Sequence, residues 1–319
     1  MRKYFTEFGL NVSTSYKTLI PVEHVQHVKD EHAYHIYFIL SCPKLFINPE
    51  SIVKEKDKIS LQMYEIVDGK PSEMKNVSFH FQGNHDHSKF EIECNYPYLG
   101  LDISLESGKR VSIDSQTIMD YGNPGNKVDF EVLYIGQAYG DQGSRVAQDR
   151  LKSHSTLQKI LTDYNVKYPD KRIYIFLLEI CPILNTIMDG FHKSMASEEE
   201  ENKHFKDVFE NPLKMDQIIN ITEAALINYF KPEYNINFVE NFPDTEHKGY
   251  TQYFDLDYNS LTVELDLEFG YPYTCISFYT DTNVIKNSFD IIQYDLFNDP
   301  DRDSMYAMFL TPSDMIKEE

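Results

Sequence analysis

The chain has 319 residues, of which 41% are hydrophobic and 14% aromatic, and its formal net charge is −21. This composition excludes a disordered chain, because there is ample apolar and aromatic material for a core. The charge excludes a protein that coats nucleic acid through overall positive charge, although it leaves room for a local basic site.

Cysteine spacing and hydropathy exclude further classes of protein. The four cysteines form no CxxC pair, so neither a zinc ribbon nor a thioredoxin motif is indicated. The N-terminal residues lack the apolar segment of a secretory signal, and the apolar runs are too short to cross a bilayer. We therefore expect a cytoplasmic protein without a membrane partner.

Composition along the chain predicts three regions. Residues 1–110 are β-rich, residues 111–240 mix strands and helices, and residues 241–319 are β-rich and acidic, with a net charge of −12. The two β-rich ends are expected either to pack together or to form separate units. Within the middle region, residues 145–172 have the opposite sign of charge from the rest of the chain, with a net charge of +4.

The middle region begins with a strand and a helix. A strand is expected at 130–135, followed by a loop and a helix at 144–164, for which Asp141 or Ser144 is a candidate cap. On this helix Arg150 and His154 are four residues apart and are expected to share one face near the helix start, where phosphate is favoured.

The second half of the middle region again contains a strand followed by a helix. A buried strand is expected at 172–180, and the acidic run at 198–201 is expected in an exposed loop or insertion. A second helix at 214–230 is ended by Pro232. On its apolar face lies Glu223, which must be paired, protonated or bound to a hard divalent cation, a salt bridge to an arginine being the alternative.

Four motifs occur in a fixed order in this region. They are Tyr134-Ile135-Gly136 at the end of a strand, the Arg150 to His154 segment, Glu223 on a later helix, and Lys231-Pro232 followed by Asn235. Together they resemble the GIY-YIG nuclease domain over residues 111–240.

The resemblance implies an α+β fold, in which a small mixed domain with a three-stranded antiparallel sheet and helices is flanked by the β-rich N- and C-terminal regions. It implies phosphodiester cleavage with one divalent metal, Mg²⁺ or Mn²⁺. Tyr134 matches the tyrosine near the attacked phosphate, and Arg150 the cation that holds it. His154 matches an orienting or relaying histidine, Glu223 the metal ligand, and Asn235 a residue that closes the site.

The first tyrosine motif of this family is not evident ahead of Tyr134. In the preceding stretch Tyr121 is the only tyrosine. The role of the family's first tyrosine is therefore expected to fall to Tyr121, Tyr139 or His154. The alternative is that the domain binds its substrate without cutting it. Arg145 is an alternative to Arg150, because the loop after Gly136 is long.

Two groups of histidines offer weaker candidates for metal binding. One contains His24, His27, His32 and His35, and the other lies around a turn at residues 80–87. Structural histidines are the preferred interpretation of both groups, because neither has the spacing of a strong zinc motif.

We therefore expect a metal-dependent endonuclease that hydrolyses phosphodiester bonds, with DNA as the favoured substrate. Arg145, Lys152 and Lys159 of the basic segment are expected to bind nucleic acid. The alternative is a catalytically degenerate domain that binds nucleic acid or protein, and the β-rich ends are candidates for a protein partner.

Overall fold

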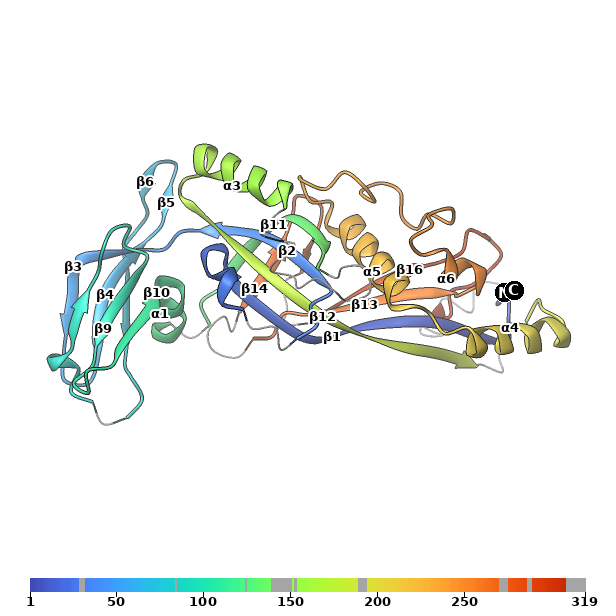
Figure 1. Ribbon diagram of the computed structural model, residues 1–319, viewed down its shortest axis with the longest axis horizontal. Coiled ribbons are helices and arrows are strands. Elements are labelled where there is room, and N and C mark those ends of the chain that lie inside the picture. The colour runs from blue at the N-terminus through green and yellow to red at the C-terminus, as the bar shows by residue number, and fades with distance from the viewer. Residues whose placement is uncertain are drawn as a thin grey trace, which may run out of the picture.

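The computed structural model describes residues 1–28, 32–83, 85–123, 125–138, 151, 154–188, 194–269, 275–285 and 289–307. These residues form a mixed α+β fold in which one large sheet dominates and helices are few (Figure 1). In this part of the chain no helix is long and apolar enough to cross a membrane.

The large sheet has eight strands. Their order across the sheet is β15 (Val284–Ile285), β14 (Ile276–Tyr279), β11 (Val128–Gln137), β2 (Ile36–Pro43), β12 (Lys171–Met188), β1 (Thr6–Pro21), β13 (Ser260–Asp266) and β16 (Phe289–Asp295). The neighbours β11, β2, β12 and β1 pair antiparallel, whereas β13 runs parallel to β1 and β14 parallel to β11.

This sheet differs from the three regions expected from composition. It takes strands from 1–110, from 111–240 and from 241–319, so the β-rich ends pack together with the middle of the chain. The physical reason lies in β12, whose first part is a continuous apolar run at residues 173–178. Such a strand is stable only where both its faces and both its edges are covered.

Residues 44–127 form a separate β-rich unit inserted between β2 and β11, at the left of Figure 1. It contains two three-stranded antiparallel sheets around its own apolar core. The first sheet is β3 (Phe46–Lys54), β4 (Ile59–Tyr64) and β7 (Lys75–Phe79), and the second is β8 (Glu91–Glu93), β9 (Gly100–Ser104) and β10 (Arg110–Asp114). The short strands β5 (Ile66–Val67) and β6 (Lys70–Pro71), η2 (His87–Lys89) and helix α1 (Ser115–Gly122) complete the unit.

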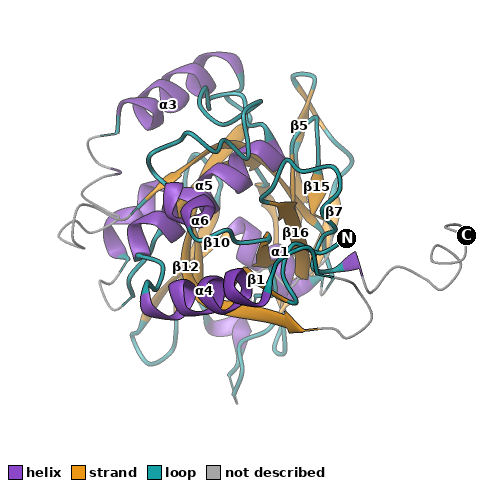
Figure 2. Cartoon of the chain, turned by 90° about the vertical axis from the view of Figure 1, so that its right-hand side faces the viewer, coloured by secondary structure: helices purple, strands orange, loops and turns teal. Residues whose placement is uncertain are grey.

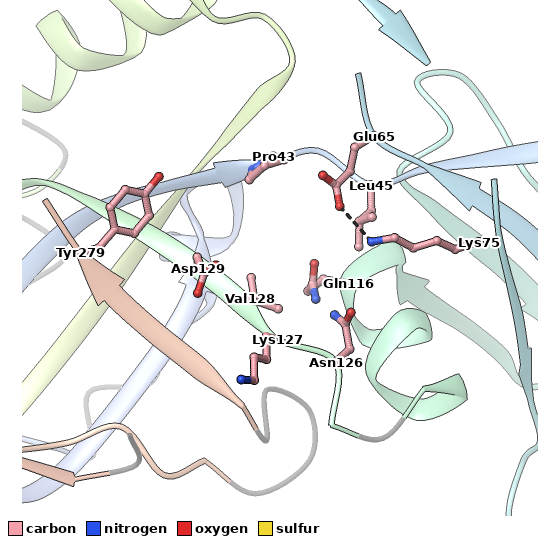
Figure 3. A pocket seen from close by; sticks show the side chains of 10 residues that line it. All are labelled: Pro43, Leu45, Glu65, Lys75, Gln116, Asn126, Lys127, Val128, Asp129 and Tyr279. Carbon is pink, nitrogen blue, oxygen red and sulfur yellow. Dashed lines mark hydrogen bonds and ion pairs between the residues drawn. The ribbon is translucent and has the colours of Figure 1, made fainter. Parts of the chain in front are cut away.

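The junction between this insert and the large sheet is hollowed. A cavity of about 260 Å³ separates Asp129 and Tyr279, on the strands of the sheet, from Glu65 and Lys75 of the insert (Figure 3). An ion pair of 3.4 Å joins Glu65 to Lys75 on the insert side. The two units therefore meet through their connecting segments, an ion pair between Arg172 of β12 and Asp114 of β10, and a partly open seam.

Helices cover both faces of the large sheet. Helix α5 (Met215–Phe230) packs on one face with α6 (Thr251–Asp255), and both contribute to the main apolar cluster. Helix α3 (Ser155–Lys167) and the 3₁₀ helix η1 (Val22–His27) contribute to a second cluster on the opposite face. Alternation along β12 separates the two clusters, since Ile175 and Leu177 face α3 while Phe176 and Leu178 face α5.

Helix α4 (Glu198–Glu210) lies at the end of the sheet next to β1 and β12 (Figure 2). The prediction of an exposed loop at 198–201 is wrong. Ser197 and Glu200 form a reciprocal capping box, and the acidic first turn favours the positive end of the helix dipole. The Glu201 carboxylate accepts hydrogen bonds from the main-chain N–H groups of Phe5 and Thr6, which ties the helix to β1.

Two other local expectations have clear outcomes. The helix expected at 214–230 is confirmed as α5, which ends where Lys231 adopts a left-handed conformation (φ 49°) before Pro232. Within residues 241–319, which were expected to be β-rich, Thr251–Asp255 forms the short helix α6 instead of a strand. The helical turn buries Tyr253 in the core. A strand could bury the same side chain, so the apolar pattern of these residues does not distinguish a helix from a strand.

Candidate active site

Strands β2 and β11 bring two tyrosines together at one end of the sheet. Tyr37 of β2 lies opposite Gly136 of β11, and a bulge between Val132 and Tyr134 shifts the register just before this point. A bulge changes which face a side chain meets. Tyr134 consequently faces the same side as Tyr37, and the two ring centroids are 6.0 Å apart.

His154 completes this group from the start of α3. It is the N-cap of the helix, with an extended backbone, and its Nδ1 accepts a hydrogen bond from the Leu157 N–H at 3.3 Å. A neutral imidazole whose Nδ1 is an acceptor carries its proton on Nε2. Nε2 therefore donates to the Tyr37 hydroxyl oxygen, 3.1 Å away.

The capping role of His154 corrects one expectation. A single helix over 144–164 was expected to place Arg150 and His154 on one face, but His154 stands outside the helix as its cap. Its side chain satisfies a free N–H of the first turn, which a residue within the helix could not do. The expected caps Asp141 and Ser144 lie outside the described residues.

The three rings pack closely against a glycine. The His154 centroid is 5.3 Å from that of Tyr134 and 5.8 Å from that of Tyr37. A Cβ atom on Gly136 would lie 2.7 Å from both the Tyr37 Oη and a ring carbon of Tyr134. Gly136 is thus required by close approach of the two tyrosines, and any side chain there would push them apart.

Glu223 reaches the same end of β11 from the other side. Its carboxylate accepts a hydrogen bond of 2.7 Å from the Gln137 side-chain amide, which also donates to Asn220 at 2.5 Å. Gln137 is the last residue of β11. Successive side chains of a strand point to opposite faces, so the Gln137 side chain points toward α5, away from the face on which Gly136 meets the tyrosines. Glu223 and the tyrosine pair therefore lie at one strand end but on opposite faces of the strand.

Asn235 serves the main chain of β11. Its side-chain oxygen accepts from the Ile135 N–H and its amide donates to the Ile135 carbonyl, each at 2.9 Å. The preceding residue, Tyr234, donates its N–H to the Leu133 carbonyl at 3.1 Å. Since β14 pairs only with residues 128–131 of β11, this segment after α5 covers the remaining edge of the strand.

Of the expected basic residues, Lys159 falls in the described part of the chain. Its ammonium lies 5.5 Å from the centroid of the Tyr234 ring. Arg145, Arg150 and Lys152 lie outside the described residues, as does Tyr139.

Tyr121, another candidate for the role of the first tyrosine, is not part of the apolar cluster to which Tyr37 and Tyr134 contribute. It belongs to α1 of the inserted unit and is 49% exposed. The tyrosine that lies next to Tyr134 is Tyr37.

No group of three His, Cys, Asp or Glu side chains able to hold a metal occurs within the described residues. Two of the histidine candidates, His35 and His87, have structural partners. The His35 Nδ1 accepts from the Ile180 N–H at 3.1 Å, and the His87 Nε2 accepts from the Phe81 N–H at 2.9 Å. A Mg²⁺ ion needs fewer protein ligands, because it commonly binds through one or two carboxylates together with substrate phosphate and water.

Tyr37 is the residue that the sequence analysis did not find. Its signal was present as His35-Ile36-Tyr37 at the start of an apolar strand, whereas Tyr134-Ile135-Gly136 lies near the end of one. The inserted unit of residues 44–127 separates the two strands in sequence, so a search limited to the residues just before Tyr134 could not reach it.

Comparison with protein-family models, with curated proteins and with solved structures finds no match for this chain. The chemistry of the site must therefore be argued from its geometry. A phenol that accepts a hydrogen bond from a neutral imidazole is suited to proton transfer, and a carboxylate at the same strand end is suited to a hard cation.

Proposed function

We propose that this protein is a metal-dependent endonuclease of the GIY-YIG type that hydrolyses phosphodiester bonds, with DNA as the favoured substrate. The observation that carries the proposal is the hydrogen bond between Tyr37 Oη and His154 Nε2, beside Tyr134. The residue types and their order along the chain, together with this contact, support it over an unspecific binding function.

Strand pairing adds support. The GIY-YIG resemblance implies a tyrosine strand that precedes the Tyr134 strand. Here β2 precedes β11, pairs antiparallel with it and places Tyr37 opposite Gly136. On the other edge of β2 lies β12, also antiparallel, so β11, β2 and β12 form the three adjacent strands that the resemblance calls for. The inserted unit then lengthens the connection between the two tyrosine strands.

Tyr37 is the proposed general base. In this role its phenol oxygen, which accepts a hydrogen bond from His154 Nε2, would take a proton from the attacking water. His154 holds that oxygen in place, and Tyr134 lines the same side of the strand. Gly136 allows the two tyrosines to approach, so the site depends on main-chain space as well as on side-chain chemistry.

Glu223 is the proposed ligand of the divalent metal, Mg²⁺ or Mn²⁺. When bound, the metal would polarise the phosphoryl oxygen as a Lewis acid. The Gln137 side-chain N–H group orients the carboxylate at the end of β11, and carboxylate oxygens are ligands that such ions prefer. Arg150 remains the proposed cation for the developing charge, on the resemblance alone.

The experiment is incubation of the protein with supercoiled plasmid and Mg²⁺ or Mn²⁺, with EDTA as a blank. We expect nicked or linear DNA, and its loss in Glu223→Gln. Glu210→Gln is the matched control, because this exposed carboxylate lies on α4. If the parent cleaves neither DNA nor RNA with either metal, the proposal is wrong.

A second candidate is a binding module without catalysis. It is favoured by one observation, the position of Glu223 on the opposite face of β11 from Tyr37 and Tyr134. In that case the parent and Glu223→Gln would bind nucleic acid equally well, and neither would cut it.

A further inference from the structure

A cavity of about 400 Å³ opens beside the start of β2. It is bordered by three elements that are separate in sequence, namely β1, η1 and the segment that leads into β2. Its volume lies within the range of small-ligand sites, about 300–1,000 Å³. The side chains that matter for its chemistry are Tyr16, Thr18, His24, His27, His32 and Tyr34.

The cavity shares a sheet face with the candidate active site. Tyr34 belongs to the same apolar cluster as Tyr37, and Ile20 and Val28, which also border the cavity, pack against that cluster together with Tyr134. A ligand in the cavity would thus lie along the α3 side of the sheet, where Tyr37 meets His154.

Its walls are flat aromatic rings. Tyr16 and His32 are stacked, with centroids 3.4 Å apart and planes 8° apart, and Tyr34 lies 6.2 Å from Tyr16. His32 is held by the Glu179 carboxylate at 3.0 Å. Tyr16 lines the cavity and keeps 41% of its surface exposed.

Its edges are formed by polar side chains. The Tyr34 and Thr18 hydroxyls lie 2.8 Å from each other, and the His24 and His27 rings are 6.0 Å apart. Among the described residues that line the cavity there is no lysine, arginine, aspartate or glutamate. Flat aromatic walls with hydroxyl and imidazole edges match a nucleobase.

We propose that this cavity receives an unpaired nucleobase of the bound strand, stacked on Tyr16. The inference rests on the proposed function and adds to it a preference for substrates with an unpaired base. Stacking on an aromatic side chain tolerates any base, so we expect preference for unpaired structure over sequence.

The test uses duplex DNA with a single-stranded overhang that carries 2-aminopurine, with EDTA present so that no cleavage occurs. Stacking quenches 2-aminopurine fluorescence. We expect quenching by the parent and by Tyr16→Phe, and its loss in Tyr16→Leu. Affinity of Tyr16→Leu for the overhang DNA should fall about tenfold, within the range of one stacked base. The control Tyr121→Leu removes an exposed tyrosine from α1 and should change neither value.

The outcomes separate the two proposals. If the parent cleaves plasmid but leaves 2-aminopurine unquenched, or if Tyr16→Leu binds like Tyr16→Phe, the base site is wrong and the nuclease stands. If quenching depends on Tyr16 but no metal supports cleavage, the base site holds and the protein is a binding module. If the parent binds no nucleic acid, both proposals are wrong.

Discussion

Asn235 forms hydrogen bonds with both main-chain polar atoms of Ile135, each at 2.9 Å, although the two residues are 100 positions apart. Ile135 lies between Tyr134 and Gly136 on β11. The segment after α5 therefore acts as a substitute for a neighbouring strand at the point where the candidate active site is built. Asn235 is a positioning residue for that strand end.

Asn235→Leu should lower the free energy of unfolding by about 1–3 kcal/mol, because it leaves the N–H and carbonyl of Ile135 without partners. Urea unfolding measures this directly. Ile236→Ala is the matched control, since that neighbour is 92% exposed and should stay within about 0.5 kcal/mol of the parent. Equal stability of Asn235→Leu and the control would contradict the positioning role.

Tyr37→Phe removes only the hydroxyl that His154 contacts. If Tyr37 is the general base, single-turnover cleavage should fall by a factor of about 10²–10⁴, while thermal stability changes little. Tyr164→Phe is the control, because Tyr164 is buried in the same apolar cluster but belongs to α3. A rate for Tyr37→Phe equal to that of the control would exclude Tyr37 from proton transfer.

Lys159→Gln tests whether the basic segment at residues 145–172 binds nucleic acid. If Lys159 contacts a phosphate, affinity for DNA should weaken alike for all sequences, and the slope of log K against log salt should become shallower by about 1. Fluorescence anisotropy at several salt concentrations measures both quantities. Lys206→Gln on α4 should leave the slope unchanged, and a parental slope in both variants would place DNA elsewhere.

Stability should depend on pH through His35. Burial lowers the pKa of this imidazole below its ordinary value of about 6.5, and the nearby Glu179 carboxylate opposes the shift only in part. The unfolded chain then binds more protons than the native protein, so the free energy of unfolding should fall as pH drops through about 6.5.

Urea unfolding at pH 7, 6 and 5 checks this prediction. His35→Asn keeps an acceptor for the Ile180 N–H but cannot titrate, so it should show a weaker loss of stability than the parent. Some loss should remain, because burial also lowers the pKa of His204. The same pH dependence in parent and variant would show that His35 does not contribute.

Local signals predicted local structure well. Helix α5 follows from an apolar periodicity that ends before Pro232, and β11 from a short apolar and aromatic run. Where two local signals compete, prediction failed. At 198–201 the acidic run indicated a loop, whereas Ser197 and Glu200 supply the capping box that starts α4.

The sequence by itself determined the mixed α+β class and the residue types of the candidate site, because periodicity, caps and motif order are properties of neighbouring residues. Only the tertiary structure decided that Tyr37 stands beside Tyr134, that His154 caps α3, and that Glu223 approaches β11 from the opposite face. The physical reason is that strand pairing is non-local. A strand pattern shows which side chains alternate, but the choice of partner strand depends on how the whole sheet buries its two faces.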